Sequence, residues 1–163
     1  MITLGITSCS SNPIAGAPTP ESTTADGSFG TTYNPCTALT NEQIASFGLD
    51  PGSKTSDVGL PADFGRGCDW HRADFGVSFV VGRQDVNHFK SSSYLDIHPL
   101  QIAGRDAVSF RLDQKGGCTV AIATGKTALT IDLVQSVTDR QAGKDPCPPV
   151  LAIAEQVAPT LPQ

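Results

Sequence analysis

The stretch "GGCTVAIATGKTALTIDLVQ", residues 116–135, decides the fold because it has the pattern of two β-strands joined by a tight turn. The turn is Thr124 to Lys126, with Gly125 at its centre. Apolar side chains recur at every second position of both strands and so share one face: Val120, Ile122, Leu129, Ile131 and Leu133. Period-two alternation around a glycine-bearing turn predicts an antiparallel pair with one face buried.

The strand pattern continues on the N-terminal side of this hairpin. Apolar and polar residues alternate from Ala107 to Leu112, and "DQKGG" then supplies turn residues. We therefore predict an antiparallel meander over Arg105–Gln135. Further upstream, "GVSFVV", Gly76 to Val81, is rich in β-forming residues and predicts another strand. The polar stretch Arg83–Ser93 is typical of a surface loop with room for a short helix, and "YLDIHPLQIAG" after it indicates a short extended piece and a turn.

Two helices are predicted, one near each end of the folded part. Thr40 is placed to cap the first helix, Gln43 three residues later completes a capping box, and the helix ends at Phe47. Asp145 caps the second helix, and Pro159 ends it. Together with the meander, this predicts an α+β domain whose antiparallel sheet is flanked by an N-terminal and a C-terminal helix.

Five cysteines are present, and Cys9 stands apart from the others near the N-terminus. The remaining four form an even set, which in a small exported domain predicts two disulfides with three possible connectivities: Cys36, Cys68, Cys118 and Cys147. We expect no metal site, because the chain has no CxxC motif and no cysteine with a histidine at ligand spacing. No cofactor is expected either.

The only tryptophan of the chain lies in "GRGCDW", residues 65–70. Cys68 and Trp70 are two residues apart in a predicted strand, so both side chains point inward and Trp70 is interpreted as a core residue. The alternative is a tryptophan that stacks on a sugar, and the candidate binding residues are then Trp70, His71 and Asp69. A carboxylate–histidine catalytic site would use the same neighbourhood: Asp63, Asp69, His71 and Asp74.

The composition excludes several classes of protein. The 163 residues carry a net charge of −5, and no basic patch is present that would bind a phosphate backbone, so nucleic acid is not an expected partner. No apolar run is long enough to span a bilayer. No GxSxG, HExxH or SxxK motif occurs, and we therefore expect no catalytic residues and no enzymatic activity.

The first residues resemble the end of a bacterial lipoprotein signal peptide. Ile6-Thr7-Ser8-Cys9 has the form of a lipobox, in which two small residues precede the cysteine that receives diacylglycerol. We expect residues 1–8 to be the remnant of a signal peptide with an upstream start, and Cys9 to be the lipidation site. Residues 9–34, rich in Ser, Thr, Pro and Gly, then form a disordered tether, and residues 35–163 form one folded domain.

The alternative interpretation of the N-terminus is a cytosolic protein. Only eight residues precede Cys9, and none of them is basic, although a complete signal peptide has a basic segment and a longer apolar one. In this interpretation Met1 is the true start and Cys9 is a free thiol in a flexible tail.

Four stretches taken together resemble the DUF3558 family of actinobacterial, mycobacteria-type secreted lipoproteins of unknown function: "NPCTALTNEQIASFGL", "GCDW", "GGCTVAIATGKTALTIDL" and "KDPCPPVLAIAEQVAPTLP". The resemblance covers Asn34 to Pro162. Its anchors are Cys36, Cys68-Asp69-Trp70, Gly117-Cys118 and Asp145-Pro146-Cys147. It implies the fold and a location on the extracytoplasmic face of the cell membrane, and it brings no catalytic residue.

The disulfide connectivity can be argued from where the cysteines lie. Cys36 and Cys147 are at predicted helix starts, whereas Cys68 and Cys118 are on predicted strands. We favour the sequential pairing, Cys36–Cys68 and Cys118–Cys147, in which each bond joins a terminal helix to the sheet. The other pairing kept open joins helix start to helix start and strand to strand.

Three functions are compatible with these observations. The favoured one is a monomeric, non-enzymatic envelope protein that is anchored to the membrane through its N-terminal lipid and binds an envelope ligand or a membrane protein. The alternatives are an envelope-stress sensor or regulatory module and, third, a hydrolase acting on envelope material. A deep apolar pocket would favour a small ligand or a lipid, whereas a flat exposed apolar patch would favour a protein partner.

Overall fold

The computed structural model describes residues 29–61, 63–113 and 117–163. The expectations for Cys9, for the signal-peptide remnant and for most of the tether lie outside these residues. The last part of the predicted tether, residues 29–34, is described and packs against the domain, since Phe29, Thr31 and Tyr33 are all buried. The folded part therefore begins before residue 35, because alternate side chains of this segment contribute to the buried interior.

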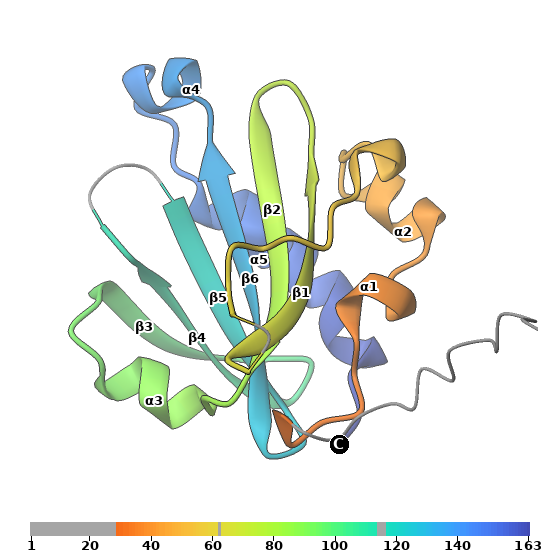
Figure 1. Ribbon diagram of the computed structural model, residues 1–163. Helices are drawn as coiled ribbons and strands as arrows, with labels where there is room; N and C mark the ends of the chain where they lie inside the picture. The colour runs from red at the N-terminus through yellow and green to blue at the C-terminus, as the bar shows by residue number, and fades with distance from the viewer. Residues whose placement is uncertain (1–28, 62, 114–116) are drawn as a thin grey trace, which may run out of the picture.

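The domain is built around a six-stranded antiparallel sheet with the strand order β1-β2-β6-β5-β4-β3 (Figure 1). Its strands are β1 (Gly65–His71), β2 (Phe75–Gly82), β3 (Leu95–Ile102), β4 (Arg105–Arg111), β5 (Gly117–Thr124) and β6 (Thr127–Gln135). The predicted meander corresponds to β4, β5 and β6, but it is only part of the sheet. Strand β3 extends it on one side, and the β1–β2 hairpin joins it on the other through the β2–β6 pair.

Strand β3 is longer than the short extended piece predicted for this region. It pairs only with β4, so it forms an edge of the sheet, and its side chains are mostly exposed or half-buried. Pro99, which has no N–H to donate, is tolerated at such an edge, and the pairing shifts register between Leu95 and His98. An exposed edge strand lacks clear apolar alternation, which is the signal that identified the other strands.

The helices of the described residues are short, apart from the last. They are α1 (Pro35–Ala38), α2 (Asn41–Ser46), α3 (Val86–Ser91), α4 (Val137–Gln141) and α5 (Cys147–Val157), with single 3-10 turns η2 (Pro51–Ser53) and η3 (Ala158–Thr160). The predicted capping box of α2 is confirmed: the Gln43 amide donates to the Thr40 hydroxyl at 3.2 Å, and the Thr40 amide donates to Gln43 Oε1 at 3.0 Å. None of these helices has the length and apolar character needed to cross a bilayer.

The terminal helices contribute to one core on one face of the sheet. Figure 1 shows α5 behind the strands, and the figure places α1 and α2 beside β1. Ile44 of α2 and Ile153 of α5 belong to the same cluster of buried apolar residues, together with Leu129 and Ile131 of β6. The apolar side of α5 therefore faces the sheet, as its sequence predicts.

The second face of the sheet is also partly buried, which the sequence did not predict. A smaller apolar cluster on this face joins α3 to β4, β5 and β6: Val86, Val108, Phe110, Ala121 and Ala128. The expectation of one buried face is therefore wrong for this half of the sheet. Val86 and Phe89 of α3 cover it, and strand β4 is consequently buried on both sides.

Two disulfides join the helices at the ends of the domain to the sheet. Cys36 at α1 is bonded to Cys68 of β1, and Cys118 of β5 is bonded to Cys147 at the start of α5. This is the sequential pairing favoured from the sequence. Cys68 and Cys118 are fully buried, so both bonds are part of the core rather than links on the surface.

Candidate ligand-binding groove

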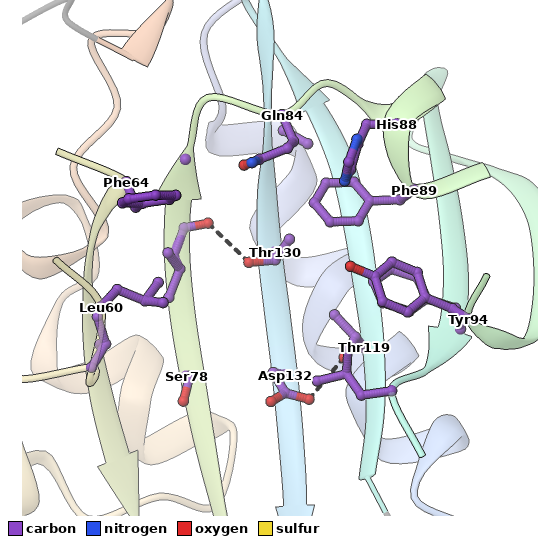
Figure 2. A pocket seen from close by; sticks show the side chains of 16 residues that line it. Leu60, Phe64, Ser78, Gln84, His88, Phe89, Tyr94, Thr119, Thr130 and Asp132 are labelled. Carbon is purple, nitrogen blue, oxygen red and sulfur yellow. Dashed lines mark hydrogen bonds between the residues drawn. The ribbon is translucent and has the colours of Figure 1, made fainter. Parts of the chain in front are cut away.

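The second face of the sheet carries a groove with a volume of about 380 Å³. Its floor is formed by β2, β6 and β5, one wall by α3 and the residues after it, and the other wall by the segment between η2 and β1 (Figure 2). The groove is lined by Val58, Leu60, Phe64, Ser78, Val80, Gly82, Gln84, His88, Phe89, Tyr94, Phe110, Leu112, Thr119, Ala128, Thr130 and Asp132.

The floor of the groove is set by strand register. Ser78 of β2 is paired with Asp132 of β6, and Asp132 is paired with Thr119 of β5, so the three side chains stand in one row on one face. The next row along β2 and β6 holds Val80 and Thr130. The Thr130 hydroxyl is not free, because it donates to the Val80 carbonyl at 3.2 Å (Figure 2).

Asp132 is the one carboxylate among the groove residues. It accepts a 2.8 Å hydrogen bond from the Thr119 hydroxyl. Burial raises the pKa of Asp132 above its ordinary value, the Thr119 hydrogen bond opposes this rise, and the nearby carboxylates of Asp69 and Asp113 add to it. The ionised form of Asp132 is therefore less favoured in the groove than it would be in water.

The wall next to α3 is aromatic. Phe89, Tyr94 and Phe110 stack on one another, with ring centroids 4.5 Å apart for Tyr94 and Phe110 and 5.4 Å for Phe89 and Phe110. Helix α3 is fixed by the Asp85 cap on the His88 amide and by an ion pair of 2.6 Å between Lys90 and Asp106 of β4. Because the helix is held at its cap and through this pair, the wall is preformed.

The opposite wall is apolar and exposed. The side chains of Leu60 and Phe64 are 48% and 56% exposed, and Leu112 at the rim of the groove is 57% exposed. Thr55 holds the start of this segment to β1 by two backbone hydrogen bonds with Asp69, of 3.0 and 2.8 Å. The wall is thus attached to the edge of the sheet while its large apolar side chains stay open to solvent.

The three candidate binding residues named from the sequence do not form one site. Trp70 is 2% exposed and packs edge-on against Phe79 in the main core, with ring centroids 5.6 Å apart. Trp70 is therefore a core residue, as its main interpretation expected, and the alternative of sugar stacking does not fit a ring buried between helices and sheet. Asp69 and His71 alternate with Trp70 along β1 and point to the opposite face.

Asp69 lies beside the groove but does not line it. It is paired with Ser78, which separates it from Asp132 in the same row of the sheet. Its Oδ1 atom is buried and, among the described residues, has no hydrogen-bond partner. Asp74, another member of the carboxylate–histidine site considered from the sequence, forms an ion pair of 2.6 Å with Arg72.

The groove residues were not identified from the sequence. Asp132 gave a weak signal, because a carboxylate in the middle of the strand "ALTIDLVQ" must face away from the core. The aromatic wall gave none, since Phe89 lies in the polar stretch Arg83–Ser93, Tyr94 in the expected extended piece and Phe110 in a predicted strand. In the part of the chain that the structure describes, no three His, Cys, Asp or Glu side chains come together as a possible metal site.

Comparison with known proteins identifies a family. The family model described as "Protein of unknown function (DUF3558)" matches residues 4–160, nearly the whole chain. No curated protein matches the sequence, and no solved structure matches it either.

Proposed function

The chain belongs to the DUF3558 family, whose function is unknown, and from its groove we propose that it is a non-enzymatic domain that binds a small, mostly apolar ligand. The observation that carries this proposal is the groove over β2, β6 and β5. Its volume of about 380 Å³ falls within the range of roughly 300–1,000 Å³ found for small-molecule sites.

The exposed apolar side chains of the groove support binding rather than a purely structural role. Leu60, Phe64 and Leu112 are each about half exposed or more, although each would gain from burial. They converge on one concavity instead of being scattered over the surface, and such a concentration marks an interaction site. The stacked rings of Phe89, Tyr94 and Phe110 give the opposite wall a rigid shape that requires little ordering when a ligand binds.

The proposed location is the extracytoplasmic face of the cell membrane, with Cys9 as the lipid anchor and the domain acting as a monomer on an envelope ligand. Two disulfides support an oxidising compartment. The lipobox-like residues before Cys9 support the anchor, and the net charge of −5 argues against nucleic acid as a partner.

Intact mass of the protein from the membrane fraction of its host tests the location. We expect a chain that begins at Cys9, carries acyl mass, and exposes four alkylatable cysteines only after reduction. A soluble chain that retains Met1 and has five free thiols would overturn this part of the proposal.

Binding of a neutral apolar fluorophore, N-phenyl-1-naphthylamine, tests the groove. The double variant Leu60→Ala/Phe64→Ala should bind the fluorophore about fivefold to tenfold more weakly than the wild type, because it removes apolar contact from one wall. Val137→Ala is the matched control, since Val137 of α4 is 58% exposed and does not line the groove. Equal affinity of both variants and the wild type, or no binding at all, would contradict the proposed function.

A further inference from the structure

The two ends of the groove differ in chemistry. Figure 2 shows Ser78, Thr119 and Asp132 at one end and Gln84 and His88 at the other, with apolar side chains between them. A ligand that fits this shape has an apolar body and a polar end. The chemistry of the polar end depends on what the row around Asp132 can recognise.

In the described part of the chain, the Asp132 carboxylate forms no ion pair. None of the residues that line the groove is a lysine or an arginine. Asp69 stands in the same row on the far side of Ser78, and its buried Oδ1 atom has no hydrogen-bond partner among the described residues. The only described hydrogen bond to the Asp132 carboxylate comes from the neutral Thr119 hydroxyl.

Basic residues of the surrounding elements are engaged elsewhere. Lys90 of α3 forms an ion pair with Asp106, Arg111 of β4 forms ion pairs with Asp96 and Asp145, and Arg72 after β1 pairs with Asp74. Lys144 pairs with Asp139, outside the groove, at 2.7 Å. Lys54, in the segment after η2, donates to the Cys36 carbonyl, and Arg83 after β2 donates to the Asp63 carbonyl at 2.7 Å. Within the described residues, each of these six basic side chains therefore has its contact at a group other than Asp132 or Asp69.

We propose that the ligand is a cationic amphiphile, with its apolar body between the two walls of the groove and an ammonium group at Asp132. This inference rests on the proposed function and adds to it the charge of the ligand and the residue that recognises it. An ammonium group at this end gains a charge-assisted contact with Asp132, and the carboxylate of Asp69, on the far side of Ser78, adds a longer-range attraction. Ser78 lies between the two carboxylates and offers a hydroxyl acceptor.

Calorimetric titration with three probes that share one alkyl chain tests the inference: decylammonium and decanoate, each below its micelle concentration, and decan-1-ol, below its solubility limit. The wild type should bind decylammonium more tightly than decanol, and decanoate most weakly. In Asp132→Asn the preference for decylammonium over decanol should fall roughly tenfold or more, the size expected for a charge-assisted contact. Glu155→Gln is the control, because it removes an exposed carboxylate from α5, which covers the other face of the sheet.

The pH dependence of the wild type gives a second measurement that needs no variant. Decylammonium keeps its charge in acid, so its affinity should fall as Asp132 becomes protonated, while the affinity for decanol changes less. An equal affinity for decylammonium and decanol, or a preference for decanoate, would overturn the inference and leave the proposed function standing. Failure of all three probes and of the neutral fluorophore to bind would instead contradict the proposed function itself.

Discussion

Thr119 and Asp132 face each other across the β5–β6 pair and share a hydrogen bond of 2.8 Å on the floor of the groove. The bond lowers the pKa of the Asp132 carboxyl, but burial outweighs it, and the pKa in the folded protein lies above the ordinary value. Folding therefore takes up a proton in the pH window between the two values.

This linkage predicts how stability depends on pH. Between the unfolded and the folded pKa of Asp132 the native state binds more protons, so the contribution of this group to stability falls as pH rises through the window. Asp132→Asn has no such contribution to lose. As pH rises, the free energy of unfolding of the wild type should therefore fall relative to that of Asp132→Asn. Urea unfolding of both proteins from acid to neutral pH measures the difference, with Glu155→Gln as the control for general charge effects. A difference that is constant across the range would contradict the prediction.

Loss of either disulfide should destabilise the domain substantially. The bonds Cys36–Cys68 and Cys118–Cys147 close loops with sequence separations of 32 and 29 residues. In the chain-entropy model each double Cys→Ser variant should lose roughly 3–4 kcal/mol of unfolding free energy, by nearly equal amounts. Urea unfolding measures both losses, and reductant added to the wild type should lower its stability further than either variant. A loss below about 1 kcal/mol for either variant would argue that the bond is incidental to stability.

Phe79 should be among the most costly residues to truncate. Its side chain is fully buried on β2, where it meets Trp70 edge-on and stacks on Phe47 at 6.1 Å between ring centroids. We expect Phe79→Ala to lower the free energy of unfolding by about 3–5 kcal/mol, whereas the exposed control Val137→Ala should change it by less than about 0.5 kcal/mol. The fluorescence of Trp70 should also shift in Phe79→Ala, since the ring beside it is removed. Similar stability of the two variants would contradict this account of the core.

Substitutions at two glycines distinguish the cost of backbone strain from the cost of steric overlap. Gly125 and Gly143 both have a positive φ, +60° and +68°, which disfavours any other residue. A Cβ at Gly125 would lie 2.5 Å from the carbonyl oxygen of Gly30, whereas one at Gly143 would meet nothing within 4 Å. Gly143→Ala should therefore cost about 1–2 kcal/mol from strain alone. Gly125→Ala should cost more, and limited proteolysis should show earlier cleavage of residues 29–34. Equal losses of stability in the two variants would mean that the segment around Gly30 moves aside without cost.

The capping box and the hairpin were predictable because each rests on local chemistry. Thr40 and Gln43 satisfy amides within one turn of helix, and the alternation around Gly125 fixes which face of the hairpin is buried. The pattern of Cys68 and Trp70, two residues apart, likewise placed both side chains in the core. In each case the residues that interact, or that share a face, are close in the sequence or belong to one strand.

The groove was not predictable because its residues come together only through the sheet topology. Ser78 and Asp132 are neighbours because β2 pairs with β6, and nothing in either strand specifies that partner. Strand β3 was underestimated for a related reason, since an exposed edge strand that contains Pro99 has little apolar alternation to detect. Phe89 and Tyr94 line a wall because α3 packs over β4 and β5. The polar sequence of Arg83–Ser93 allowed a short helix but gave no sign of this packing.

The sequential disulfides have a consequence for how the chain folds. Cys36–Cys68 closes a loop in the N-terminal half, Cys118–Cys147 closes one in the C-terminal half, and neither bond spans the β2–β6 pair. In the oxidised unfolded chain the two disulfide-closed loops are therefore joined only by the connecting segment and move independently of each other. The β1–β2 hairpin and the β3–β6 meander can each form from local contacts, whereas joining β2 to β6 requires closure of a long segment with no covalent help. We expect the docking of these two halves to limit the folding rate, with the groove completed only in that last step.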